Sequence, residues 1–257
     1  MSMDAASRLE INLVSGWMNA AGYAGYAPPV DSNITSPPVA FVTNPISFHS
    51  RTPAADRFCS PYPCGFLLHT GWPNPGFRKV LKQFSARWTR SEIPVWVHLL
   101  AEQPQELNRM VRTLEETEGV AAVEISLPPT ARDEWMLQLA EAALGELPLV
   151  ICVPLDQVTA AWVSGVINLG ISGLVISAPR GMIRNAAGSF SRGRMIGPGL
   201  FPQVLQALGC LRAYDIPLIA GCGVFDIKSM DTLLSAGATA VQLDAVLWRG
   251  WDNRNCS

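Results

Sequence analysis

The sequence contains very little lysine. Three of its basic residues are lysines, namely Lys79, Lys82 and Lys228, and none lies between positions 83 and 227. A lysine amine is needed for a Schiff base, and it often supplies the ammonium group beside a cofactor. Chemistry of that kind is therefore excluded from the long central stretch of the chain.

The sequence is also poor in charge of either sign. Charged residues make up 16% of the chain, hydrophobic residues 49%, and the net charge is −2, whereas about 25% of an average globular domain is charged. Such a chain has enough apolar surface to build a large core and is not disordered. Because it has no general basic footprint, we expect neither a nucleic acid nor a membrane as partner.

Targeting and disulfide signals are weak as well. The first ten residues lack a basic flank followed by an apolar run, so no signal peptide is indicated and we expect a cytoplasmic protein. Cys59 and Cys64 are spaced closely enough for a disulfide or half of a metal site. No second cysteine or histidine pair with suitable spacing follows, so two loop cysteines and no bound metal is the favoured interpretation.

Apolar runs alternate with amphipathic helical patterns from position 94 onward. The expected strands are residues 94–100, 121–127, 148–154, 173–178, 216–220 and 238–243, with 38–43 and 65–68 as further candidates. The expected helices are 104–117, 132–144, 158–169, 200–214 and 226–236. Such alternation predicts a parallel sheet covered by helices. A doubly wound sheet alternates too, but about eight units in this length favour a single (β/α)8 barrel, with residues 1–257 as one domain.

Three polar residues fall on or just after expected strands. They are His69, His98 and Glu124, and catalytic groups of a (β/α)8 barrel lie at the carboxyl ends of its strands. We expect these three residues to form an acid–base set. For His98 another interpretation stays open, because a histidine within an apolar strand is more often a hydrogen-bonded core residue.

A segment rich in glycine and arginine, RGMIRNAAGSFSRGRMIGPG (180–199), precedes the expected helix 200–214. Barrels commonly bind phosphate with the loops after the seventh and eighth strands, and arginine forks onto phosphate or carboxylate. We therefore expect a small phosphorylated or otherwise anionic ligand here, held by Gly197, Gly221, Gly223 and Arg194. The alternative is a flexible surface loop with ordinary turn glycines.

Residues 196–247 resemble the carboxyl-terminal part of dihydroorotate dehydrogenases, in which an SG-x-x-LFP segment precedes the seventh strand and a glycine loop follows it. Further upstream, VTNPIS (42–47) resembles the VTKS segment of that family, and GWPNPGF (71–77) resembles its GLxNPG loop. The resemblance implies a (β/α)8 barrel that carries FMN over the strand ends and oxidises its substrate by hydride transfer. It also leads us to expect a homodimer. The expected cofactor contacts are Gly22, Asn44, Ser177, Arg194, Gly197, Gly221, Gly223 and Asp244.

The positions that carry the chemistry of that family differ in this sequence. Asn44 stands in place of the VTK lysine, Leu127 in place of the catalytic base, and Ile151 in place of the lysine beside the flavin. Glu124 replaces an asparagine, and Asp244 replaces a glycine that faces the FMN phosphate. Leucine cannot abstract a proton, so dihydroorotate oxidation is excluded.

The favoured function is therefore an FMN-dependent oxidoreductase that acts on another small molecule, whose identity the sequence does not give. The alternative is a flavin-free barrel that binds a different phosphorylated metabolite for lyase or isomerase chemistry, or that serves as a non-catalytic subunit.

Overall fold

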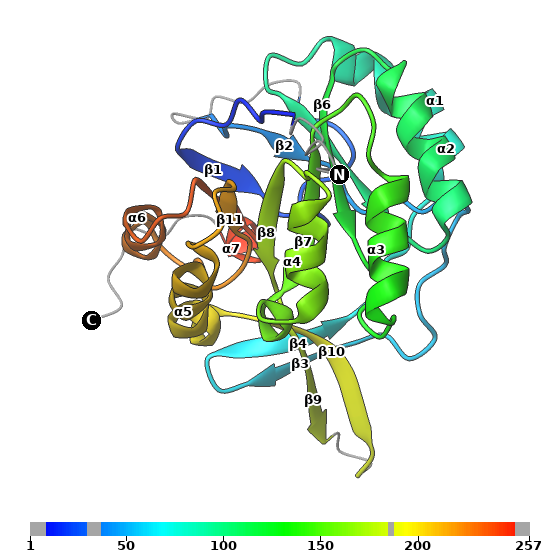
Figure 1. Ribbon diagram of the computed structural model, residues 1–257. Helices are drawn as coiled ribbons and strands as arrows, with labels where there is room; N and C mark the ends of the chain where they lie inside the picture. Colours follow the sequence, from blue (N-terminus) through cyan, green and yellow to red (C-terminus); the bar gives the residue numbers. More distant parts are fainter. Residues whose placement is uncertain (1–8, 30–36, 185–187, 250–257) are drawn as a thin grey trace.

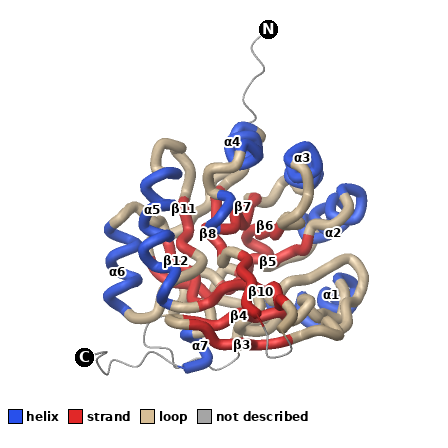
Figure 2. The backbone as a smooth tube through the Cα atoms, turned by 90° about the horizontal axis from the view of Figure 1, so that it is seen from below, coloured by secondary structure: helices blue, strands red, loops and turns tan. Residues whose placement is uncertain are grey.

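A computed structural model describes residues 9–29, 37–184 and 188–249. Eight parallel strands form one sheet in the order β1–β12–β11–β8–β7–β6–β5–β2, which curls into a ring (Figure 2). The strands are β1 (Gly16–Asn19), β2 (Phe41–Val42), β5 (Val95–Leu100), β6 (Val120–Ser126), β7 (Leu149–Pro154), β8 (Gly173–Ser177), β11 (Leu218–Ala220) and β12 (Ala240–Leu243).

The ring closes between β1 and β2 through a side chain. The carboxamide of Asn19 donates to the carbonyl of Val42 at 2.6 Å and accepts from the Val42 amide at 3.0 Å. The amide of Val39 adds a backbone bond to the carbonyl of Trp17 at 2.8 Å. Asn19 is buried, so its amide replaces the ladder bonds that the sheet lacks at this seam.

Helices surround the ring (Figure 1). They are α1 (Phe77–Thr89), α2 (Pro104–Glu115), α3 (Asp133–Ala142), α4 (Ala161–Asn168), α5 (Phe201–Leu211), α6 (Ile227–Ser235) and α7 (Val246–Arg249), with short 3-10 turns at η1 (Leu155–Gln157) and η2 (Pro198–Leu200). The expected (β/α)8 barrel is confirmed. Within the described ranges, no helix is long and apolar enough to cross a membrane.

Helix α2 shows how the sequence specifies these elements. Pro104 occupies its first turn, where the missing N–H costs nothing, and Leu107, Met110, Val111 and Leu114 recur at helical spacing. All four of these side chains are buried, so one face of the helix packs against the sheet.

Successive side chains of each barrel strand point alternately into the ring and toward the helices. On β7, Val150 and Cys152 belong to the core inside the ring, whereas Leu149, Ile151 and Val153 belong to the core between the ring and the helices. The resemblance to dihydroorotate dehydrogenases placed the flavin-side position of this strand at Ile151. That correspondence is wrong by one residue, because the residue that faces the interior of the barrel is Cys152.

A second, antiparallel sheet lies across the carboxyl end of the barrel (Figure 1). It has the order β3–β4–β10–β9 and consists of β3 (Phe58–Tyr62), β4 (Gly65–His69), β9 (Arg180–Arg184) and β10 (Phe190–Ile196). Two expectations are corrected here. Residues 65–68 do not form a barrel strand, since that place is taken by β1, and the segment 180–199 contains a β-hairpin instead of a flexible loop.

Candidate active site

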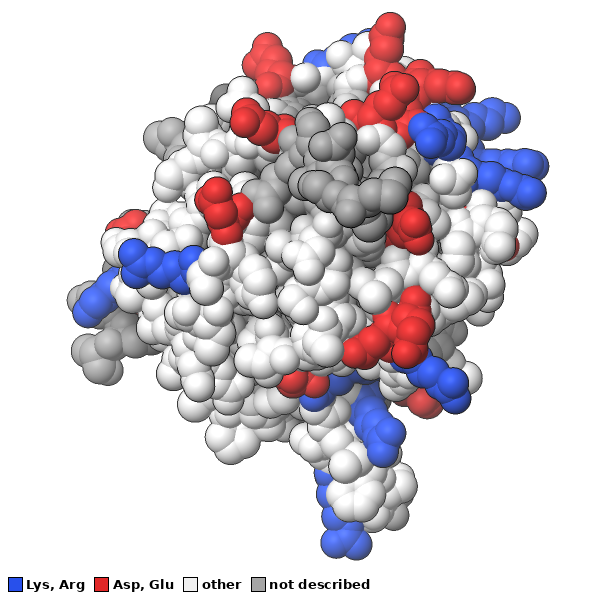
Figure 3. Space-filling view, in the orientation of Figure 1, with Lys and Arg blue, Asp and Glu red and all other residues white. Residues whose placement is uncertain are grey.

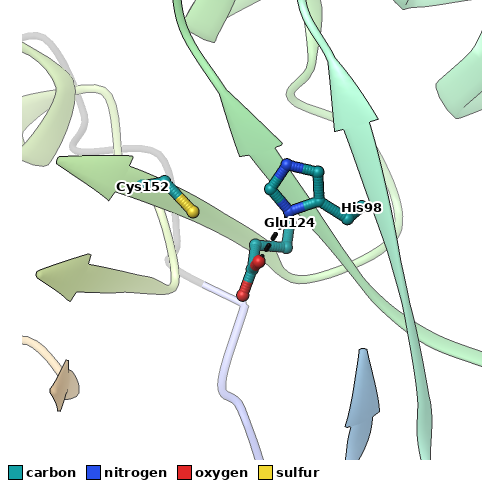
Figure 4. A group of neighbouring side chains, drawn as sticks. All are labelled: His98, Glu124 and Cys152. Atoms are coloured by element: carbon teal, nitrogen blue, oxygen red, sulfur yellow. Dashed lines mark hydrogen bonds and ion pairs between the residues drawn. The ribbon is translucent and has the colours of Figure 1, made fainter. Parts of the chain in front are cut away.

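Two of the expected acid–base residues meet inside the barrel. His98 projects inward from β5 and Glu124 from β6, and the two are directly paired in the strand register. His98 Nδ1 lies 2.6 Å from Glu124 Oε1 (Figure 4). Both side chains are buried, Glu124 to 0% exposure, so this hydrogen bond forms out of contact with bulk water.

Glu124 also contacts two groups that the sequence analysis missed. Gln242, on β12 across the ring, donates from Nε2 to Glu124 Oε2 at 2.6 Å, and the thiol of Cys152 lies within 4.8 Å of the same carboxylate. Burial, and next the charge of Glu124, raise the pKa of Cys152 well above its ordinary value. The thiol is therefore protonated, and Glu124 accepts hydrogen bonds from two other strands.

His98 Nε2 has no hydrogen-bond partner, and it is the one such buried side-chain nitrogen or oxygen atom among the described residues. His98 lines a cavity of about 80 Å³, which Ser126, Ser177 and Asp244 also line. Buried polar atoms in native proteins are nearly always paired, with protein, water or a ligand. The cavity is therefore the place from which a partner for Nε2 would come.

His98, Glu124 and Cys152 place candidate ligand atoms within 4.8 Å of one another, and the Cys152 sulfur points toward the other two side chains (Figure 4). A zinc ion would need a thiolate and a free carboxylate oxygen. Here both oxygens of Glu124 already accept hydrogen bonds, from His98 and from Gln242. These contacts favour a hydrogen-bonded layer, and the absence of a metal remains a prediction.

A stacked pair of side chains covers the inner cavity, which is the space of about 80 Å³ at His98. The guanidinium of Arg194, on β10, lies 3.7 Å from the ring centroid of Trp72, within the range of a cation–π interaction. Trp72 has a φ of 54°, which is uncommon for a bulky residue and costs about 1–3 kcal/mol. The side chain of Arg194 also hydrogen bonds to Tyr23, so three elements far apart in the chain hold the cover in place.

Asp244 follows β12 and is 7% exposed. Burial raises its pKa from an ordinary 3.8 to about 6, although the backbone amides of Val246 and Ala245 and the charge of Arg194 oppose the shift. The carboxylate thus accepts from amides at the start of α7, which is where a helix would bind an external anion.

This raised pKa predicts a stability that depends on pH. Between about pH 4 and pH 6, the folded state holds a proton on Asp244 that the unfolded state has released. The free energy of unfolding should therefore fall as the pH rises through this range, by about 3 kcal/mol for a shift of about two units, and stay level above it. Urea denaturation of Asp244→Asn should lack this fall.

Asp231→Asn, at an exposed site on α6, is the matched control and should keep the pH dependence of the wild type. Equal pH dependence in Asp244→Asn and in the wild type would contradict the assignment.

A larger cavity of about 260 Å³ lies outside this cover. It shares Trp72, Ser126, Ser177, Ala178 and Arg194 with the inner cavity, so the two spaces adjoin. His69, at the end of β4, lines the outer cavity only, and its Nε2 lies 3.3 Å from Asp56 Oδ1. The structure therefore separates His69 from the His98–Glu124 pair with which it was grouped.

The expected cofactor contacts fall in two groups, since Ser177, Arg194, Gly221 and Asp244 line the inner cavity and the others do not. Ser177 lines both cavities. Asn44 lines neither, and its Oδ1 accepts from the amide of Gly25 at 3.1 Å, which fixes the loop after β1. Gly22 has a φ of 96°, and a Cβ there would lie 2.9 Å from the ring of Trp72, so this glycine makes room for the cover.

The glycines expected to hold a phosphate are packed against the protein itself. A Cβ at Gly223 would lie 3.0 Å from the Phe201 nitrogen, one at Gly221 would meet Val175, and one at Gly197 would overlap the backbone of Cys64. The side on which each glycine lacks a Cβ thus faces the chain itself, while Gly221 also lines the inner cavity.

The inner cavity does not fit FMN. Its volume of about 80 Å³ is far below the roughly 300 Å³ at which ligand pockets for larger molecules begin, and space of that order exists only together with the adjoining cavity of about 260 Å³. Gly221 lines the inner cavity whereas Gly197 and Gly223 do not, and the buried carboxylate of Asp244 accepts from the amides at the start of α7. No step involving a flavin is therefore derived for this site.

Gln242 and Cys152 could have been found from the sequence by strand alternation. Each lies on the inward-facing set of its strand, as His98 and Glu124 do. That signal places side chains inside the ring, but it does not say which of them meet across it.

Comparison with known proteins supports a distant relationship. No protein-family model matches the chain. It is 24% identical over 209 residues to the dihydroorotate dehydrogenase B (NAD(+)) catalytic subunit of Pyrococcus furiosus, covering 72% of this chain and 67% of that protein. The corresponding subunit of Pyrococcus abyssi is 24% identical over 234 residues, 82% of this chain and 76% of its own. The corresponding subunit of Maridesulfovibrio salexigens is 25% identical over 208 residues, which cover 70% of this chain and 66% of that protein. These identities show a distant similarity to dihydroorotate dehydrogenase B catalytic subunits over most of the chain, in line with the resemblance of the sequence motifs.

Proposed function

We propose that this chain is a flavin-free acid–base enzyme on a dihydroorotate dehydrogenase-like barrel, acting on a small anionic molecule. His98 transfers the proton and Glu124 positions it. The observation that carries the proposal is the buried Nε2 of His98, which has no protein partner and belongs to a residue lining the inner cavity.

Glu124 determines which nitrogen of His98 can react. As a carboxylate it accepts the Nδ1–H of His98, which leaves the lone pair on Nε2 available to accept a proton. When Nε2 becomes protonated, the adjacent carboxylate stabilises the imidazolium. The second hydrogen bond, from Gln242, keeps Glu124 oriented toward the histidine.

The cavity limits what His98 can reach. About 80 Å³ admits the end of a small molecule, and Arg194 beside this space provides a fixed positive charge. A cation there would stabilise negative charge that develops when a proton is removed next to a carbonyl or carboxylate group. These features support isomerase or lyase chemistry that begins with such a proton transfer.

A flavin-dependent oxidoreductase is the second candidate. It is favoured by the likeness to the dihydroorotate dehydrogenase B catalytic subunits and opposed by the small inner cavity and the buried Asp244. This candidate has to place the flavin in the outer cavity of about 260 Å³ or displace the Trp72–Arg194 pair.

Two measurements on the purified wild-type protein separate these functions. The first is its visible absorbance spectrum, followed by a fluorescence titration with FMN. The second is NMR of a panel of small phosphorylated ketones, aldehydes and keto acids in D2O. We expect a colourless protein that takes up no FMN and that catalyses deuterium incorporation into a member of the panel. A flavin spectrum or tight FMN uptake would favour the oxidoreductase, and the absence of exchange across the panel would overturn the acid–base proposal.

A further inference from the structure

The hairpin formed by β9 and β10 presents arginines on one face. Arg194 pairs with Arg180 across the two strands, and Arg192 pairs with Met182. Residues directly opposite each other in an antiparallel pair share a face, as do alternate residues along a strand. No aspartate or glutamate occurs between positions 180 and 196, and the projecting hairpin in the space-filling view is blue and white only (Figure 3).

This clustering of like charge is not offset by a direct ion pair at the exposed end of the described hairpin. Like charges directly opposite each other on a sheet are destabilising. Arg194 has Asp244 and Tyr23 nearby, but no acidic side chain of the described residues forms an ion pair with Arg180 or Arg192. An external anion bound between these guanidinium groups would offset the repulsion.

The arginine face borders a groove. A space of about 440 Å³ lies between the hairpin and the loops after β6 and β7, with Arg180 and Arg192 on one wall and Pro129, Pro154 and Asp156 on the other. The two arginines outnumber the single carboxylate, so the groove keeps a net positive charge. Arg180, Pro129 and Pro154 also line the outer cavity. The groove, the outer cavity and the inner cavity therefore adjoin in sequence, from the hairpin to His98.

We infer that this groove binds the phosphate group of the substrate, between Arg180 and Arg192, while the other end of the same molecule enters the inner cavity at His98. The position of the reacting end rests on the proposed function; the phosphate site in the groove does not. Arginine suits this role because its planar guanidinium presents several N–H donors to a phosphate. The groove thus takes the role expected of Gly197, Gly221 and Gly223, of which Gly221 alone lines either of the two cavities.

The test is isothermal titration calorimetry with inorganic phosphate at low ionic strength, where charge pairing is least screened. The double variant Arg180→Ala/Arg192→Ala should bind phosphate at least tenfold more weakly than the wild type, and each single variant should lie between the two. Arg212→Ala, which removes an exposed arginine beyond the end of α5, is the matched control and should bind phosphate as the wild type does.

A further variant separates this inference from the proposed function. His98→Asn should leave phosphate affinity unchanged, because the phosphate lies outside the inner cavity. The arginine variants could lose phosphate binding while the wild type catalyses no deuterium exchange. That result would support the phosphate site in the groove and contradict the acid–base function. Unchanged phosphate affinity in the double variant, or no binding to the wild type at millimolar phosphate, would overturn the groove assignment even where exchange is observed.

Discussion

Replacing Glu124 with alanine is expected to lower the free energy of unfolding by about 3–5 kcal/mol, the loss typical of removing one partner from a buried charged pair. The carboxylate is 0% exposed and accepts hydrogen bonds from His98 and Gln242. Alanine leaves these two donors buried without an acceptor and opens a cavity between them. Urea denaturation followed by circular dichroism measures the change.

Two further substitutions show whether the loss comes from the hydrogen-bond network. Glu124→Gln preserves the shape and one acceptor, so it should cost about 1–3 kcal/mol, as for one unsatisfied buried group. Glu118→Ala, at an exposed site just before β6, should change stability by less than about 0.5 kcal/mol. A Glu124→Ala variant as stable as Glu118→Ala would show that the hydrogen bonds of Glu124 are dispensable for folding.

The barrel could be read from the sequence because its strands are buried on both faces. Continuous apolar runs such as PVWVHLL and PLVICVP, each followed by an amphipathic pattern, are typical of parallel strands covered by helices. The strand at residues 65–68 was assigned to the wrong sheet, because a short apolar run has the same appearance in either sheet. The pairing with β3 and β10 depends on long-range contacts that a local pattern does not contain.

The candidate site was predictable in part. His98 and Glu124 stand out as polar residues within apolar strands, and their adjacency follows from neighbouring strands in register. Gln242 enters the site from across the ring, which no spacing along the chain predicts. The glycine positions stay ambiguous for a physical reason, because a glycine that lets a ligand approach and one that lets another chain segment approach look alike in a sequence.

The low lysine content is consistent with the site that the fold builds. The cations lining the two cavities and the groove are arginines, namely Arg51, Arg180, Arg192 and Arg194. Arg51 is paired with Glu102, and Arg194 is held by Trp72. Fixed, planar cations of this kind orient anions and stabilise charge, and in the proposed enzyme the proton transfer itself falls to a histidine.

Replacing His98 with asparagine is expected to reduce the rate of deuterium exchange by about 10²–10⁴-fold, the usual contribution of a general base. Asparagine retains an amide that can donate to Glu124 in place of Nδ1, while it removes Nε2 altogether. The substitution therefore tests the reactive nitrogen separately from the buried hydrogen bond. The measurement is deuterium incorporation by NMR into whichever compound the wild type exchanges.

Three readouts distinguish proton transfer from a structural role for His98. His49→Asn, at an exposed histidine outside both cavities, should exchange as the wild type does. Glu124→Gln should also lose exchange, because a glutamine amide that donates to Nδ1 places the remaining proton of His98 on Nε2 and removes its lone pair. In His98→Asn, kcat should fall while inorganic phosphate binds with unchanged affinity. Exchange that persists in this folded variant would exclude His98 as the base. The buried hydrogen bonds among His98, Glu124 and Gln242 would then be a structural feature of the barrel.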